Sequence, residues 1–249
     1  MAAAGTAAKT RLEIILVGVV HGDPQGYNKA MALLEELRPA AVGVEISRYS
    51  WDYRRRWVRR WQEQFRAAQA ALPPAHRQHL ALQRLAAQIA LPFEVRAAAA
   101  YARCHRRVWA PLDINAISRE HLPRYHRELL TPENLRHLTA DPDGSLAAFI
   151  RREYDRAVHL LGRPGAPWPR CLAVDPQSTM REKVLAHRLR RLAQQWSRVV
   201  HFGGWEHLIY TGGHHTLADL LAPWEPQRLL LSSPLTDFGK TAGKGMNHE

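Results

Sequence analysis

The sequence predicts an α/β fold with a mixed, mainly parallel central sheet flanked by helices and interrupted by a helical insertion. Near the N-terminus, an apolar run at residues 12–20 is followed by helical spacing at 28–37 and a second apolar run at 41–45. This β–α–β order over about 30 residues implies parallel strands joined by a crossover helix. Late in the chain, an amphipathic helix at 179–196 leads into another apolar run at 198–202. These two units indicate two sheet-forming parts of one fold.

The middle of the chain is predicted to be helical. Aromatic residues recur at helical spacing from Trp51 to Phe65, and Pro73-Pro74 ends that helix. Further helices are expected at His76–Ala90, Phe93–Cys104, Arg119–Leu130, Pro132–Leu138, Ser145–Leu161 and Leu217–Leu221, with strands at Val108–Asp113 and, at a sheet edge, Arg228–Leu231.

The domain organisation follows from these elements. We expect one α/β domain over 11–232 with a helical insertion at about 51–107, because 249 residues suffice for a sizeable core. Residues 1–10 are expected to be a disordered lead-in, and 233–249 a flexible tail rich in Gly and Lys. No run of 18 apolar residues occurs, so no transmembrane helix is expected.

The charge balance is strongly basic. The chain has 35 Lys plus Arg against 23 Asp plus Glu, and only five of the basic residues are lysines, so 35 − 5 = 30 are arginines. Such a balance is typical of nucleic-acid binding, but Arg with abundant Ala and Leu also follows from a GC-rich genome. The two cysteines, Cys104 and Cys171, form no Cys-x-x-Cys pair, which favours a reducing cytoplasm; a disulfide between them is the alternative.

Two apolar runs end in the same short motif, Gly-x-x-His. The first is Gly18-Val19-Val20-His21, and the second is Gly204-Trp205-Glu206-His207. Gly18 and Gly204 leave room for close backbone approach, where a side chain would crowd a site. If the two strands lie in one sheet, both histidines reach the same edge.

Two carboxylates also stand at the ends of predicted strands, Glu45 and Asp113. In open α/β sheets, ligands bind outside the carboxyl ends of the strands. Two histidines and a carboxylate form a ligand set for Zn²⁺, Mn²⁺, Co²⁺ or Fe²⁺, and a bound metal makes its water a nucleophile. We therefore predict His21, Glu45 and His207 as metal ligands and catalytic residues, with Asp113 assisting. The alternatives are that Glu45 is a solvated strand end and that Asp113 caps a turn.

The other candidate histidines and the Arg-rich helix each have more than one interpretation. His214 and His215 either form a solvated loop before the next helix or add a ligand or proton shuttle. The Arg-rich helix at 51–66 either buries its aromatic residues beneath solvated arginines, grips nucleic acid, or lines a cleft for a carboxylate-bearing ligand.

The segments "VGVVHGD", "RPAAVGVE" and "MREKVLAHRL…VVHFGGWEHL" resemble the TraB/PrgY–TIKI superfamily and its EreA/ChaN-like relatives. The likeness covers residues 12–50 and 172–222, plus Asp113. It implies an α/β fold of two related halves, with a site formed by the two histidines and the glutamate named above. TIKI members are described as metal-dependent peptidases and PrgY acts on a peptide pheromone, whereas Ere members open macrolide lactones and ChaN binds haem.

The chain departs from that pattern at two positions. Many relatives carry Arg-Asp a few residues before the methionine of the late helix, where this chain has Asp175-Pro176-Gln177-Ser178-Thr179-Met180 and so lacks the arginine. Relatives often have an acid after the glutamate of the second strand, where this chain has Ile46-Ser47-Arg48. We expect Arg48 or Arg181 to supply the missing positive charge. The predicted substrate-binding residues are Arg48, Arg181, His214 and His215.

These observations predict a cytoplasmic, metal-dependent hydrolase of the TraB/TIKI type that acts on a peptide or ester. The first alternative is a non-catalytic peptide- or haem-binding protein of the same fold. A weaker alternative is nucleic-acid binding through the Arg-rich helices. The expected partner is a peptide or small-molecule substrate, and a homo-oligomer is left open.

Overall fold

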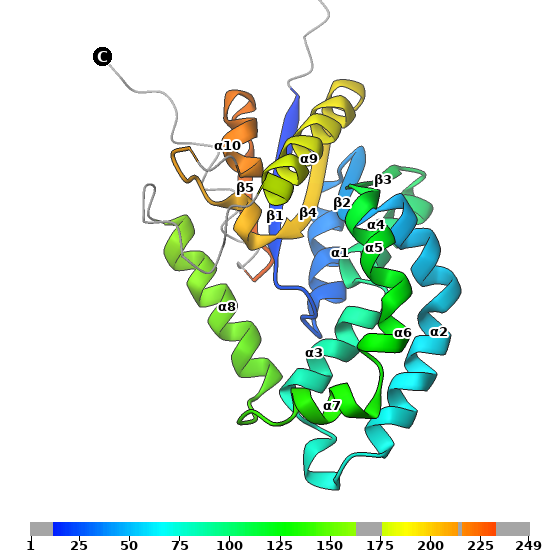
Figure 1. Ribbon diagram of the computed structural model, residues 1–249. Helices are drawn as coiled ribbons and strands as arrows, with labels where there is room; N and C mark the ends of the chain where they lie inside the picture. Colours follow the sequence, from blue (N-terminus) through cyan, green and yellow to red (C-terminus); the bar gives the residue numbers. More distant parts are fainter. Residues whose placement is uncertain (1–11, 163–175, 214–215, 233–249) are drawn as a thin grey trace, which may run out of the picture.

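The computed structural model describes residues 12–162, 176–213 and 216–232, and these form an α/β fold around one five-stranded sheet (Figure 1). The strand order is β3-β2-β4-β1-β5, and every pairing between described strands is parallel. The strands are β1 (Glu13–Val19), β2 (Ala41–Ser47), β3 (Val108–Asp113), β4 (Arg198–Gly204) and β5 (Gln227–Leu230). The predicted α/β class with flanking helices is confirmed, and the last strand is at an edge as expected.

Helices occupy most of the remaining described chain. The α-helices are α1 (Gly26–Leu37), α2 (Arg48–Ala70), α3 (Leu80–Ile89), α4 (Phe93–His105), α5 (Asn115–His121), α6 (Tyr125–Glu128), α7 (Pro132–Leu138), α8 (Leu146–Leu161), α9 (Pro176–Gln195) and α10 (Leu217–Leu221). Short 3₁₀ helices are η1 (Pro74–His76), η2 (Leu122–Arg124), η3 (Trp205–Leu208) and η4 (Ala222–Trp224). None of the described helices combines the length and the apolar character needed to cross a membrane.

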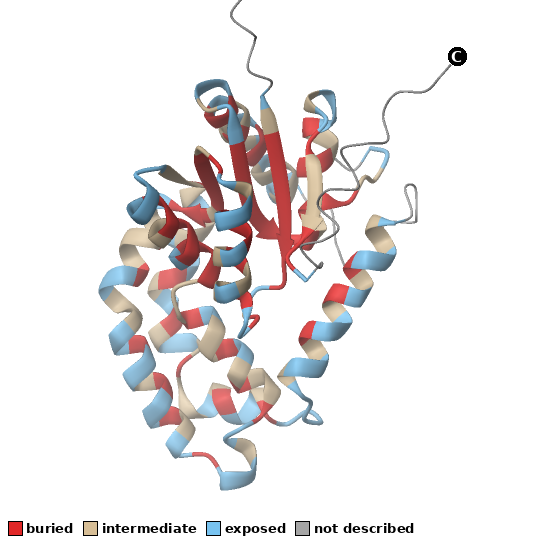
Figure 2. Ribbon diagram, turned by 180° about the vertical axis from the view of Figure 1, so that it is seen from behind, coloured by how far each residue is buried: buried red, intermediate tan, exposed pale blue. Residues whose placement is uncertain are grey.

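Each face of the sheet has its own apolar core. Because side chains alternate along a strand, Ile15 and Val17 pack with α1, α4 and α8, whereas Ile14 and Leu16 pack with α9 and α10. The three inner strands, β1, β2 and β4, are almost wholly buried, which explains their apolar sequences, whereas the edge strands β3 and β5 are mostly half-buried (Figure 2).

A second group of helices packs beyond the carboxyl ends of the strands. This helical cap consists of α2, η1, α3, η2, α6 and α7, and its core is built on Trp61, Phe65 and Leu82 (Figure 1). Its helices come from two segments of the chain, one before β3 and one after it. Within the expected insertion at 51–107, α4 instead packs against α1 and the sheet.

The two look-alike strands are neighbours in the sheet. β1 pairs with β4 so that Gly18 lies opposite Gly203 and Val19 opposite Gly204. The second Gly-x-x-His motif is therefore shifted by one residue relative to the first. The ladder ends at Gly204, and Glu206 and His207 then follow on η3.

Gly18 is required where η3 crosses the sheet. A Cβ atom at Gly18 would lie 2.9 Å from the backbone Cα of Trp205 and 3.0 Å from the side chain of Leu230. The close backbone approach that the sequence predicted at Gly18 is confirmed. This contact sets how η3 leaves β4.

Replacing Gly18 with Ala is expected to destabilise the fold by about 1–3 kcal/mol, because the Trp205 backbone must move to admit the methyl group. Gly162→Ala is the matched control. Gly162 is exposed and has a helical φ of −79°, so its substitution should change the free energy of unfolding far less. Denaturant unfolding of both variants checks this, and equal effects would contradict the role given to Gly18.

Candidate active site

The sheet brings the expected site residues to one edge. His21 lies in the turn after β1, Glu45 is the fifth residue of β2, Asp113 is the last residue of β3, and His207 is carried by η3 after β4. These elements end next to one another because their strands are adjacent and parallel.

Glu45 is the centre of the cluster. One carboxylate oxygen, Oε1, accepts a hydrogen bond from Arg181 and lies 3.1 Å from His207 Nε2. The other, Oε2, accepts the backbone N–H of Gly204 at 2.7 Å and lies 3.8 Å from His21 Nε2. The side chain is only 6% exposed. Burial raises its pKa, but His207 and Arg181 outweigh burial and hold the pKa of Glu45 well below its usual value.

Arg181 of α9 joins Glu45 to Asp113. Its guanidinium donates from Nε to Asp113 Oδ1 at 2.8 Å and from Nη2 to Asp113 Oδ2 at 2.9 Å. This two-pronged geometry suits a planar guanidinium and a carboxylate. Farther along α9, Arg188 donates to the backbone carbonyls of Leu112 and Asp113. Asp113 therefore anchors Arg181, and the end of β3 is tied to α9.

His207 is held between two carboxylates. Its Nδ1 lies 2.5 Å from Glu182 Oε1, and its Nε2 lies 3.1 Å from Glu45 Oε1. Burial lowers the pKa of His207, but Glu45 and Glu182 together raise it well above the usual value. Both nitrogens therefore carry hydrogens and donate, as in an imidazolium cation.

The contacts of these side chains bear on the expected metal centre. Both ring nitrogens of His207 face carboxylates and Arg181 occupies Oε1 of Glu45, so a metal held by these two residues would have to displace contacts that they already make. Across the described residues, no group of three or more His, Cys, Asp and Glu side chains has the arrangement needed to hold a metal ion. The arrangement instead suits proton transfer and fixed charges.

His21 is the accessible histidine of the site. Its Nδ1 lies 2.8 Å from Glu94 Oε1, and Glu94 of α4 is only 2% exposed, whereas the imidazole is 53% exposed. Burial of the ring opposes protonation, but Glu94, Glu45 and Glu206 outweigh it and raise the pKa of His21 to about 9. Solvent around the exposed half of the ring weakens these attractions. His21 is therefore a positively charged group at neutral pH that faces solvent.

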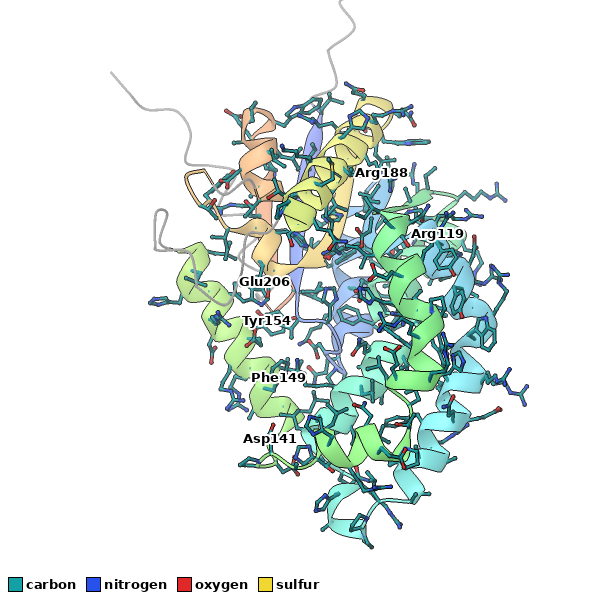
Figure 3. All side chains as sticks on the ribbon, in the orientation of Figure 1. Arg119, Asp141, Phe149, Tyr154, Arg188 and Glu206 are labelled. Atoms are coloured by element: carbon teal, nitrogen blue, oxygen red, sulfur yellow. The ribbon has the colours of Figure 1, made fainter. Side chains whose placement is uncertain are left out.

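Glu206 stands across Gly204 from His21. A Cβ atom at Gly204 would lie 2.9 Å from Glu206 Oε2 and 3.6 Å from His21 Nε2. Both side chains therefore approach the backbone at Gly204, where a side chain would crowd Glu206, as the sequence predicted. Glu206 lies near the lower ends of the strands, beside α8, which carries Tyr154 (Figure 3). Burial raises the pKa of Glu206.

His201 lies beneath the cluster on β4, opposite Gly43 of β2. It is fully buried, and neither ring nitrogen has a hydrogen-bond partner among the described residues. Burial lowers its pKa to about 4, so the ring is neutral. His201 therefore adds no charge beside the cations Arg181 and His207.

The remaining residues that the sequence suggested for binding are not part of the Glu45 cluster as the structure describes it. Arg48 is 73% exposed and pairs with Asp52 one helical turn along α2, away from the cluster. His214 and His215 lie outside the described residues. In the Arg-rich helix, Trp61 and Phe65 are buried, and Arg60 lies over the ring of Trp57. That arrangement matches a packed aromatic face with arginines laid over it.

Sequence reasoning did not single out Glu94, Glu182 or Glu206. Glu206 lies inside the second Gly-x-x-His motif, and Glu182 directly follows Arg181. Both carboxylates therefore lie in segments that already contained candidate site residues, and this position was the signal that could have identified them. Glu94 opens a helix after Pro92, where an acidic residue usually serves the helix end. Its pairing with His21 spans 73 residues of sequence.

Comparisons with known proteins give no relative for this site: the chain matches no family model, no curated protein and no solved structure.

Replacing Arg181 with Met should destabilise the protein by about 2–4 kcal/mol, because Glu45 and Asp113 lose their shared cation while they stay largely desolvated. Arg48→Met is the matched control, since an exposed i,i+4 pair contributes about 0–1 kcal/mol. Urea unfolding measures both. Equal effects would show that the Arg181 contacts do not hold the cluster.

The raised pKa of His21 predicts a pH-dependent contribution to stability. This contribution is complete below the unfolded value of 6.5 and is lost as the pH rises through about 9, because the folded state then no longer binds the extra proton. Between these pH values, the unfolding midpoint should fall more in the wild type than in His21→Gln. His187→Gln, which alters an exposed histidine of α9, should follow the wild type. Parallel curves for wild type and His21→Gln would contradict the assignment.

Proposed function

We propose that the protein is a hydrolase that cleaves an ester or peptide bond at the carboxyl edge of the sheet. The observation that carries this proposal is the pair formed across Gly204 by His21 and Glu206. The half-exposed imidazole is charged at neutral pH, and the pKa of the facing carboxyl is also raised. A proton donor and a proton acceptor that both lie close to one backbone position are the kind of pair that general acid–base hydrolysis uses.

The reaction follows from the charges of the two groups. Glu206, once ionised, takes a proton from a water molecule, and the water oxygen bonds to the substrate carbonyl carbon. His21 donates a hydrogen bond to the carbonyl oxygen as it becomes negative, and then gives its proton to the leaving oxygen or nitrogen as the scissile bond breaks. Transfer of the proton from Glu206 to His21 through solvent restores the site, so one water is consumed for each bond cleaved.

The surrounding residues keep the two groups in these states. Glu94 fixes the ring of His21 through Nδ1, which leaves Nε2 as the atom directed at the space beside Gly204. Glu45 stays ionised near that nitrogen and favours the protonated ring. The Arg181 and His207 contacts hold Glu45 itself, so these residues act by positioning and by charge.

The metal implied by the family resemblance enters no step of this mechanism. Of its three expected ligands, His207 has both nitrogens directed at carboxylates and Glu45 has one oxygen bound to Arg181. A metal-dependent hydrolase on the same fold remains a prediction from the resemblance, and chelation of the purified protein tests it.

Turnover should be sought with a panel of p-nitrophenyl acyl esters and short fluorogenic peptides. We expect the wild type to hydrolyse at least one class, and Glu206→Gln and His21→Gln each to lower kcat by roughly 100-fold or more. Glu36→Gln, which neutralises an exposed glutamate of α1, should keep full activity. Substrate binding without turnover in the wild type would favour a non-catalytic binding protein.

The pH profile and chelation of the same assay separate the two mechanisms. Activity should rise as Glu206 ionises and fall as His21 loses its proton near pH 9, which gives a bell-shaped profile. EDTA should leave the rate unchanged. If EDTA abolishes the activity and added Zn²⁺ or Mn²⁺ restores it, the protein is a metal-dependent hydrolase instead.

A further inference from the structure

A second site lies beside the edge of the sheet, in a cavity of about 330 Å³ between α2, α3, α5 and α6. We propose that this cavity binds a small molecule carrying an oxyanion, a carboxylate or a phosphate, and that Arg54 is the anchor. The proposal goes beyond the hydrolase assignment and does not depend on turnover. The residues around the cavity are Ser50, Arg54, Gln88, Ile117, Ser118, His121, Leu122, Tyr125 and Leu129.

Arg54 is a buried cation, with only 9% of its surface exposed. Its Nε donates to Ser50 Oγ at 3.1 Å, and its Nη1 donates to the carbonyls of Gln88 at 2.6 Å and Ala90 at 3.1 Å. The guanidinium also lies over the ring of Tyr125, 6.0 Å from its centre. These contacts fix the guanidinium in place before any ligand arrives.

None of these partners is an anion. Among the described residues, no carboxylate forms a salt bridge with Arg54, and its hydrogen bonds use Nε and Nη1. Burial lowers the pKa of this guanidinium, and the buried carboxylate of Glu94 attracts it only from a distance, without a salt bridge. An oxyanion in the cavity would supply a directly bound counter-charge, and a guanidinium presents to it a planar fork that suits carboxylate and phosphate.

The rest of the cavity suits a small ligand with an apolar body. Ile117, Leu122 and Leu129 supply apolar wall, and the hydroxyl of Ser118 supplies a polar atom. Gln88 and His121 are exposed and stand where the cavity meets solvent, whereas Arg54 is buried behind them. The volume is at the lower end of ligand sites, which matches a molecule of a few carbon atoms with one anionic end.

The cavity shares its framework with the candidate active site. Ser47, two residues after Glu45, donates from Oγ to Ser118 Oγ at 2.9 Å and accepts the backbone N–H of Ser50 at 2.9 Å. Tyr49 N–H donates to Asn115, two residues after Asp113. The ends of β2 and β3 therefore set both sites, and the bound anion is either part of the substrate or a separate ligand.

The test is titration of the full chain with inorganic phosphate and, separately, with butyrate at constant ionic strength held with chloride. Binding is read from the Arg54 Nε–H signal in ¹H–¹⁵N spectra, assigned by its loss in Arg54→Gln. We expect a saturable shift with at least one probe. No saturable shift with either probe would overturn the proposal. The tighter probe identifies phosphate or carboxylate as the preferred group.

Variants locate the binding and guard against misfolding. Arg54→Gln should weaken calorimetric affinity at least 10-fold, whereas Arg55→Gln, which alters the exposed neighbour on α2, should leave it unchanged. If Arg54→Gln does not fold, Ser118→Leu serves in its place. Its larger side chain fills the cavity and should also weaken the affinity at least 10-fold. Unchanged affinity in Ser118→Leu would overturn the proposal.

Comparison with the catalytic variant separates the two sites. Glu206→Gln should bind the probe as the wild type does, so a failure of the hydrolase proposal leaves this one standing. Competitive inhibition of wild-type ester turnover by the tighter probe would identify the anion as part of the substrate, and binding without inhibition would identify a separate ligand.

Discussion

The carboxylate of Glu45 is the constraint around which the site is organised. A charged group on a central strand of a buried sheet is tolerated only if cations and hydrogen-bond donors surround it. Here these come from α9, from η3 and from the backbone of β4, through Arg181, His207 and Gly204. One side chain of β2 thus fixes how three other elements meet at the carboxyl edge of the sheet.

Glu45 is surrounded by cations, and each of these cations is in turn bound to a second carboxylate. Arg181 is shared with Asp113 at the end of β3, and His207 is shared with Glu182 on α9. Each cation therefore has two anionic partners, and no member is left unpaired in the interior. His21 differs because it is half-exposed and has Glu94 behind it, so it is the member of the group most available to a ligand.

The helical cap connects this edge to a second polar site. Because α2 begins directly after β2 and α5 soon after β3, the two strand ends that carry Glu45 and Asp113 also set the walls around Arg54. Arg54, which forms no salt bridge with a described carboxylate, and Glu45, which is surrounded by cations, are thus held by the same segments. Under the proposal above, the cap takes part in ligand binding in addition to covering apolar surface.

The sequence by itself determined the α/β class, the five strands and the positions of His21, Glu45, Asp113 and His207 at or after strand ends, because apolar runs and strand-end positions are local patterns. The strand order that brings these residues together came from the tertiary structure. Tertiary structure alone decided the partners of each group. The turn of the chain from β4 into η3 placed Glu206 near His21 beside Gly204, and the crossing of α9 gave His207 and Glu45 their partners Glu182 and Arg181. The pKa of a histidine or carboxyl depends on such neighbours, which no local pattern records.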